Sequence, residues 1–251
     1  MPAAEKDVDT MESIARKQGF VTRTLKTEKA TRENVIAEFG AAASELDTGD
    51  FFLVTFSGHG DWVKDISGDE EDQRDDTWCL YNGYFLDDEL NVLLAAFKPG
   101  CRVLVLSDSC HSGTMLKGGK DEKDEAQEME DEFVYSRAMP RRVSFESYEN
   151  HFQYYADLQL ALPQPRPEIV ASVRLISGCQ EDEESFGSKE TGRFTEAVKN
   201  VFADGSFHGN YKQFHAAIVK EISKAGNPQT PGHTVVGVPD KSYDNQRPFK
   251  I

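Results

Sequence analysis

The chain has 251 residues, of which 38% are hydrophobic and 29% charged, which is the balance of a folded globular protein rather than a collagenous or disordered one. A chain of this length can bury a substantial core in one or two domains without disulfide support. No stretch is apolar enough for a membrane-spanning helix and the polar amino terminus is unlike a secretory signal, so we expect a cytoplasmic protein. The formal net charge of -16 disfavours nucleic acids and anionic membranes as partners.

Hydrophobic periodicity predicts alternating strands and helices. A helix at 11–17 is followed by a strand at 21–25 and by an amphipathic helix that Thr31 caps. Three continuous apolar runs are typical of strands buried on both faces of a parallel sheet: 51–56, 103–106 and 173–176. Helices are expected from Asp87 to about Phe97, at 195–202 and at 211–225, with a last strand at 234–238. This order predicts an α/β fold with a mostly parallel central sheet and helices on both faces.

The alternation breaks down between residues 118 and 167. This stretch contains an acidic run, a basic cluster and an aromatic patch, with few signs of regular structure. A loop of this length is either functional or disordered. We therefore interpret 118–167 as a flexible linker between the parts 1–117 and 168–251.

Reactive residues follow two of the predicted buried strands. The first strand leads into Ser57-Gly58-His59-Gly60, and the second leads into Ser107-Asp108-Ser109-Cys110. Because parallel strands end at one edge of a sheet, we expect His59 and Cys110 to lie side by side, where the imidazole can deprotonate the thiol. The alternative is a core histidine and an inert cysteine. The spacing from 59 to 110 is close to the roughly 50 residues between histidine and cysteine in caspase-type enzymes.

The motifs FSGHG at 56–60 and DSCHSG at 108–113 resemble the two catalytic motifs of metacaspases and their bacterial relatives, the caspase-like cysteine peptidases. The segments ISGCQ at 176–180 and NPQTP at 227–231 extend this resemblance toward the carboxyl terminus. The resemblance implies a three-layer caspase-like fold, in which 1–117 is the large-subunit-like part and 168–251 the small-subunit-like part of one domain. It also implies Cys110 as nucleophile, His59 as base and acid, and the N–H groups of Gly60 and Cys110 as the oxyanion hole, a chemistry that requires no cofactor.

The resemblance further implies an acidic substrate pocket. Asp108 corresponds to the carboxylate at the pocket floor, the segment AEKDV at 4–8 resembles a family loop that makes Asp7 the second carboxylate, and Ser57 lines the wall. Two carboxylates favour a guanidinium or ammonium group, so we expect protein or peptide substrates that are cut after Arg or Lys. The basic residues of the linker are then candidates for self-cleavage: Arg137, Arg141 and Arg142.

Calcium activation is left open. Position by position, the resemblance assigns calcium to Asp75, Asp87 and Asp88, but Lys117 stands where the family pattern has a fourth aspartate.

The family pattern also begins with a buried strand ahead of the AEKDV segment, and this sequence does not contain it. Either the sequence is a fragment, or another segment takes that place; otherwise the neighbouring strand has an open edge.

The resemblance favours a monomer. The rival interpretation is a caspase-like interaction or regulatory module that is catalytically idle. A metal-dependent hydrolase is disfavoured, because the sequence has no cluster of His and Cys residues that could bind a metal ion.

Overall fold

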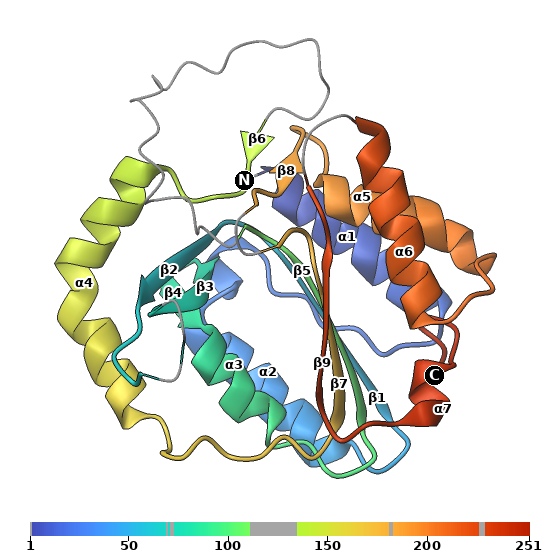
Figure 1. The fold of residues 1–251 in the computed structure, drawn as a ribbon, viewed down its shortest axis with the longest axis horizontal. Coiled ribbons are helices and arrows are strands. Elements are labelled where there is room, and N and C mark those ends of the chain that lie inside the picture. Colours follow the sequence, from blue (N-terminus) through green and yellow to red (C-terminus); the bar gives the residue numbers. More distant parts are fainter. Residues whose placement is uncertain (1, 69, 71–72, 111–134, 181–182, 226–228) are drawn as a thin grey trace.

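The central sheet has four strands in the order β1-β5-β7-β9. In the computed structural model, which describes residues 2–68, 70, 73–110, 135–180, 183–225 and 229–251, these strands are β1 (Phe51–Ser57), β5 (Arg102–Asp108), β7 (Ser172–Ser177) and β9 (Gly232–Gly237). The first three are parallel and β9 is antiparallel to β7 (Figure 1). The three apolar runs of the sequence therefore form three adjacent parallel strands of one mostly parallel sheet, as predicted.

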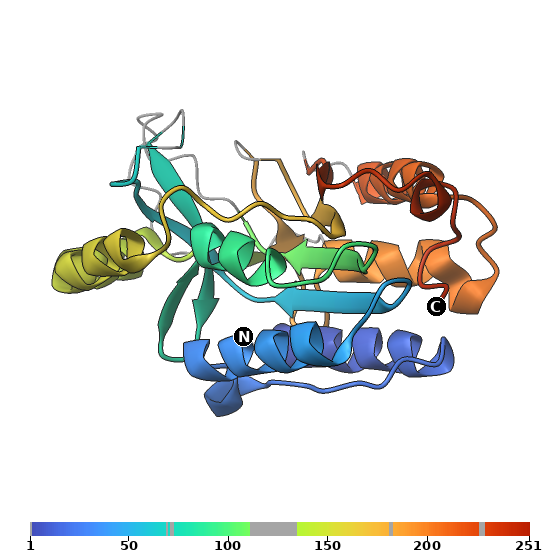
Figure 2. The same ribbon diagram turned by 90° about the horizontal axis from the view of Figure 1, so that it is seen from below.

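Helices cover both faces of this sheet, so the fold has three layers (Figure 2). One face packs against α1 (Pro2–Lys17), α5 (Arg193–Phe202), α6 (Tyr211–Ile222) and the short α7 (Lys241–Asp244). The other face packs against α2 (Arg32–Glu45) and α3 (Asp87–Leu94). Thr31 caps α2 as expected, because its hydroxyl accepts a hydrogen bond from the backbone N–H of Asn34. Single 3-10 turns occupy Thr27–Lys29, Ala203–Gly205 and Ser223–Ala225.

A smaller antiparallel sheet stands beside the central one. It consists of β2 (Gly60–Lys64), β3 (Arg74–Leu80) and β4 (Gly83–Leu86). The long helix α4 (Arg141–Ala161) packs against β2 at the left of Figure 1. A two-residue strand pair, β6 (Tyr135–Ser136) with β8 (Phe186–Gly187), lies above the carboxyl edge of the central sheet.

Three predictions about local structure are wrong. The segment AEKDV is not a loop, because it forms part of α1, which begins nine residues earlier than the predicted helix at 11–17. Residues 21–25 are not a strand, since they have no strand partner among the described residues. The predicted linker 118–167 is not irregular throughout, because 21 of its residues form α4.

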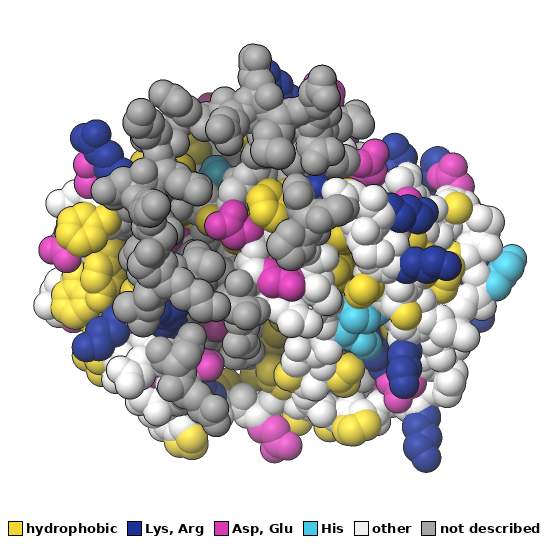
Figure 3. Space-filling view, turned by 45° about the horizontal axis from the view of Figure 1, so that its top comes forward, with side chains coloured by type: hydrophobic (Ala, Val, Ile, Leu, Met, Phe, Trp, Pro, Cys, Tyr) yellow, Lys and Arg dark blue, Asp and Glu magenta, His cyan; other side chains and the backbone are white. Residues whose placement is uncertain are grey.

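Several apolar side chains of α4 face outward. Figure 3 shows hydrophobic side chains gathered over this helix at the left of the molecule. They include Phe145, which is 60% exposed, and Leu160, which is 67% exposed. Within the described residues, every helix is too short or too polar to cross a lipid bilayer.

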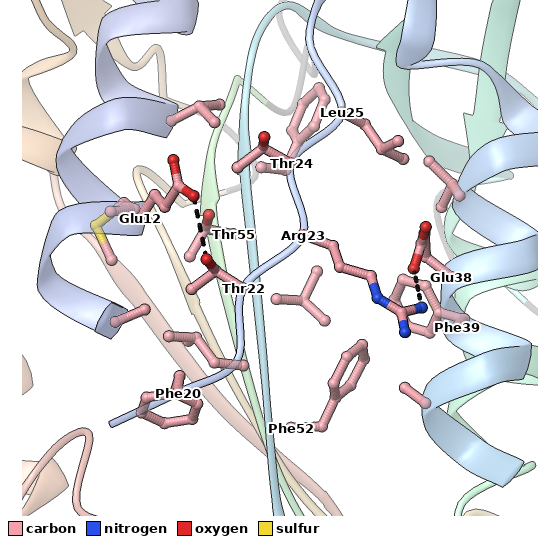
Figure 4. Close-up of a pocket in the computed structure, with 18 of the residues that line it drawn as sticks. Glu12, Phe20, Thr22, Arg23, Thr24, Leu25, Glu38, Phe39, Phe52 and Thr55 are labelled. Atoms are coloured by element: carbon pink, nitrogen blue, oxygen red, sulfur yellow. Dashed lines mark hydrogen bonds and ion pairs between the residues drawn. The ribbon is translucent and has the colours of Figure 1, made fainter. Parts of the chain in front are cut away.

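The outer edge of β1 has no strand partner within the part of the chain that the structure describes. Among the described strands β1 pairs only with β5, and six of its seven residues are only partly buried, whereas β5 is buried almost throughout. A groove of about 740 Å³ runs along this edge between α1 and α2 (Figure 4). Its far wall is the extended segment from Phe20 to Leu25, which runs on the other side of the two helices from β1 in Figure 2.

Candidate active site

The candidate site lies at the carboxyl edge of the central sheet. Ser57 at the end of β1 is in register with Asp108 at the end of β5, so His59 and Cys110 follow neighbouring strand ends, as predicted. The backbone N–H of Gly58 donates to the carbonyl of Asp108 over 3.2 Å and joins the two loops. A Cβ atom on Gly60 would lie 1.8 Å from the carbonyl oxygen of Cys110, so only glycine allows this approach.

The sulfur of Cys110 is buried and hydrogen-bonded. The backbone N–H of Ser185 donates to Sγ over 2.9 Å, and Sγ lies 3.2 Å from the carbonyl oxygen of the same residue. Burial opposes ionisation of the thiol, but hydrogen bonds from Cys179 and from Ser185 outweigh it and lower the pKa of Cys110 below its ordinary value. A thiolate is therefore more accessible here than in an ordinary buried cysteine.

The imidazole of His59 lies against one particular peptide bond. Its Nδ1 atom is 3.2 Å from the carbonyl oxygen of Arg137, and the ring also interacts with the backbone of Ala138. Burial lowers the pKa of His59, and the hydrogen bond to the Arg137 carbonyl only partly offsets this. The ring is accordingly neutral at physiological pH and able to accept a proton.

The side chain of Arg137 fills the predicted acidic pocket and is completely buried. Its Nη2 atom is 2.5 Å from Asp7 Oδ2, and its Nε atom is 3.2 Å from Asp108 Oδ1. Its Nη1 atom donates to Ser57 Oγ over 2.7 Å and to the carbonyl of Asp108 over 3.1 Å. Burial alone would lower the pKa of Arg137, but the two carboxylates more than compensate, so the pKa is raised and the guanidinium stays charged.

The two pocket carboxylates are held by residues from the far half of the chain. Asp7 accepts hydrogen bonds from the hydroxyl of Thr191 (2.8 Å) and from the N–H of Gly192 (3.0 Å). Asp108 accepts two from Thr195, one from its N–H (3.0 Å) and one from its hydroxyl (2.7 Å). These bonds fix both carboxylates in the positions from which they contact the guanidinium.

The main chain around Arg137 is bound on both sides. On the amino-terminal side β6 pairs with β8, and the N–H of Arg137 donates to the carbonyl of Ser185 over 2.8 Å. The N–H of Gly60 donates to the carbonyl oxygen of Arg137 over 3.1 Å. The segment around Arg137 thus crosses the site in an extended conformation. The Arg137 side chain lies in the pocket, and its own carbonyl group lies beside Gly60 and His59.

Comparison with known proteins agrees with these motifs. A family model described as metacaspase, peptidase C14 domain, matches residues 5–118. Residues 5–118 thus resemble the peptidase domain of metacaspases. Metacaspase-1B of Aspergillus fumigatus is 36% identical over 91 residues, which cover 34% of this chain and 22% of that protein. Metacaspase-1 of Scheffersomyces stipitis is 28% identical over 201 residues, which cover 68% of this chain and 48% of that protein.

A solved structure agrees over nearly the whole chain. Protein GSU0716 from Geobacter sulfurreducens is 40% identical, with a TM-score of 0.85 over 99% of this chain and 89% of that chain. By contrast, the matches to the two fungal metacaspases span about a fifth to a half of those proteins' length. The family-model match runs from within α1 to ten residues past the end of β5, and it includes every predicted catalytic and pocket residue.

The structure brings together most residues that the sequence singled out for the predicted site: Asp7, Ser57, His59, Gly60, Asp108, Cys110 and Arg137. The other two self-cleavage candidates are elsewhere: Arg141 is the first residue of α4, and Arg142 is exposed beside Glu146. Sequence analysis missed Ser185, Thr191, Gly192 and Thr195. Of these four, only Gly192 has a residue type that hints at a close contact. A Cβ atom at this position would lie 2.1 Å from Asp108 Oδ2.

The predicted calcium residues lie near one another, but among the described residues they are not arranged as a metal site. Burial and the carboxylates of Asp76, Asp75 and Asp88 raise the pKa of Asp87 well above its ordinary value, which indicates crowded negative charge. Arg166 already makes two hydrogen bonds to Asp88. Within the described part of the chain, no group of three or more potential ligands is arranged to hold a metal ion, and Lys117 lies outside it.

Proposed function

We propose that this chain is a cysteine endopeptidase that hydrolyses peptide bonds after Arg or Lys, with Cys110 as nucleophile and His59 as base and acid. The family supports a cysteine peptidase of the caspase-like kind. The observation that carries the specificity is the burial of Arg137 between Asp7 and Asp108, with its own carbonyl beside Gly60 and His59.

The arrangement supports a defined sequence of steps. Neutral His59 takes the proton of the Cys110 thiol, and the sulfur attacks the carbonyl carbon of Arg137. The N–H of Gly60 already contacts the oxygen that becomes negative, so it stabilises the tetrahedral intermediate. The C–N bond then breaks as His59 protonates the leaving nitrogen of Ala138, and a thioester forms. Water, deprotonated by His59, hydrolyses the thioester and regenerates the thiol.

A lysine is expected to be a weaker substrate than an arginine. The pocket contacts three separate guanidinium nitrogens, with Nη2 at Asp7, Nη1 at Ser57 and Nε at Asp108. A single ammonium group cannot reach all three acceptors at once, although it would still be attracted by the two carboxylates. An aspartate would place a third negative charge in the same pocket and is not expected to be accepted.

We further propose that the first substrate is the chain itself, cut between Arg137 and Ala138. The experiment is to incubate the purified chain alone and to measure intact masses over time, with Cys110→Ala, Arg137→Gln and Arg142→Gln variants in parallel. We expect the starting chain and the Arg142→Gln control to yield two fragments that meet at 137 and 138, and the other two variants to stay whole. An uncut starting chain, or cleavage that persists in Cys110→Ala, would refute the proposal.

Fluorogenic peptides ending in Arg, Lys or Asp test the wider specificity, with and without calcium. Hydrolysis after Arg and Lys that disappears in Cys110→Ala is the expected result. Silence on every peptide together with an uncut chain would instead favour the idle interaction module. Calcium activation stays a prediction from the resemblance, and the calcium arm of this experiment tests it.

A further inference from the structure

Resting on the proposed function, we infer that the enzyme has an apolar subsite for the second residue after the cut, and that Met139 occupies it when the chain cuts itself. The subsite would select a large, uncharged, flexible or aliphatic side chain such as Met or Leu in a substrate. This recognition is separate from the acidic pocket, because it involves other elements of the fold.

The backbone at Met139 is fixed by the same glycine that binds the carbonyl at the cut. The N–H of Gly60 donates to the oxygen of Arg137 over 3.1 Å, and the carbonyl of Gly60 accepts from the N–H of Met139, also over 3.1 Å. Gly60 thereby forms an isolated parallel bridge with Ala138. The two hydrogen bonds span the Arg137–Ala138 bond, so the second residue beyond the cut has a defined position relative to the first.

The side chain of Met139 packs on a buried apolar cluster. The core of this cluster is Val63 of β2, Tyr84 and Leu86 of β4, and Tyr155 of α4, all of them at most 4% exposed. Polar contacts make the walls rigid: the hydroxyl of Tyr155 accepts from the N–H of Tyr84 over 3.0 Å. A polar or charged side chain placed against this surface would lose its water without gaining a partner.

The elements that form the subsite are also bound together below it. Ser144 of α4 donates to Asp61 of β2 over 2.9 Å, and Tyr84 of β4 donates to the other oxygen of the same carboxylate over 2.6 Å. Asp61 is buried, so these bonds fix α4 against both strands. The apolar surface is therefore preformed and does not depend on a side chain entering it.

The test compares self-cleavage rates of the full chain carrying Met139→Leu, Met139→Ala or Met139→Asp. A methionine and a leucine fill similar volume, so we expect Met139→Leu to be cut within about twofold of the starting rate. We expect the rate to fall about tenfold for Met139→Ala, which loses most of the apolar contact, and about 100-fold for Met139→Asp, which places a charge against the apolar cluster at a partly buried position. Val143→Ala, a truncation at an exposed position of α4, is the matched control and should leave the rate unchanged.

A fluorogenic peptide that ends in Arg, with only a dye after the cut, separates this inference from the proposed function. Measured on chains that have already been cut after Arg137, all variants should hydrolyse it at the same rate, because it carries no residue for the subsite. Equal self-cleavage rates across the three Met139 variants, with the peptide still hydrolysed, would overturn the subsite and leave the peptidase intact. Loss of peptide hydrolysis in Met139→Asp would show a damaged site rather than lost recognition, and that also overturns the inference. A chain that cuts neither itself nor the peptide refutes the proposed function itself.

Discussion

Neutralising one carboxylate of the acidic pocket should selectively weaken cleavage after arginine. Asp7→Asn keeps the shape of the side chain but removes the charge that Arg137 Nη2 meets at 2.5 Å in a fully buried pair. A hydrogen bond to a charged group contributes about 1.5–3 kcal/mol. At about 1.36 kcal/mol for each factor of ten, kcat/KM on an Arg peptide should fall roughly 10- to 150-fold.

The assay uses two fluorogenic peptides, one ending in Arg and one in citrulline, which has nearly the same shape but no charge. The loss of kcat/KM for the citrulline peptide should be much smaller, because uncharged citrulline gains little from the carboxylate charge that Asp7→Asn removes. Asp9→Asn is the matched control, since Asp9 lies on the same helix but pairs with Lys26 at the surface. Equal losses on both peptides, or a loss below threefold on Arg, would show that charge in this pocket does not select the substrate.

Three further changes test the thiol, the pocket and the pH response. Cys179→Ala removes a hydrogen bond to the sulfur of Cys110, so the thiol pKa should rise and the pH profile of its alkylation by iodoacetamide should move upward; an unchanged profile argues against this tuning. Gly192→Ala places a methyl group 2.1 Å from a pocket oxygen, so self-cleavage measured by mass spectrometry should slow at least about tenfold, while Gly40→Ala, with nothing within 4 Å, should not slow it. Burial lowers the pKa of His233 from 6.5 to about 4 in the folded chain, so stability present above pH 6.5 should be lost as the pH falls toward 4. Because this imidazole is partly exposed we expect a loss of only about 1–2 kcal/mol, measurable by urea unfolding at pH 7 and pH 4.5 and largely absent in His233→Asn.

The parts of the fold that sequence predicted best are those with the strongest local pattern. Strands β1, β5 and β7 are continuous apolar runs because their positions lie between two layers of helices. The strands of the small sheet were missed, since β3 begins Arg-Asp-Asp and reads as a solvated acidic loop. Asp75 is nevertheless completely buried in that strand. The neighbouring strands β2 and β4 bury Asp75, and this burial cannot be predicted from the sequence pattern around the residue.

The site divides in the same way. His59 and Cys110 were predictable because each follows a recognisable strand within a few residues. The choice of Arg137 over two nearby arginines was not, because it depends on the hydrogen bond that its N–H donates to the carbonyl of Ser185, almost fifty positions away along the chain. Arg142 has the same side chain, but a helix holds its backbone where no strand can pair with it. Tertiary placement, rather than residue type, distinguishes the two.

The open edge of β1 has a consequence for how copies of this chain meet one another. A strand with free N–H and C=O groups can pair with the same strand of another molecule, which leads to aggregation. Charged side chains line the groove beside this edge, among them the pair Arg23–Glu38 at 2.9 Å, with Glu12 on the opposite wall (Figure 4). A second β1 that approached would have to strip water from these charges before its backbone could bond. The charged side chains of the groove therefore oppose edge-to-edge pairing of β1 between two copies of this chain.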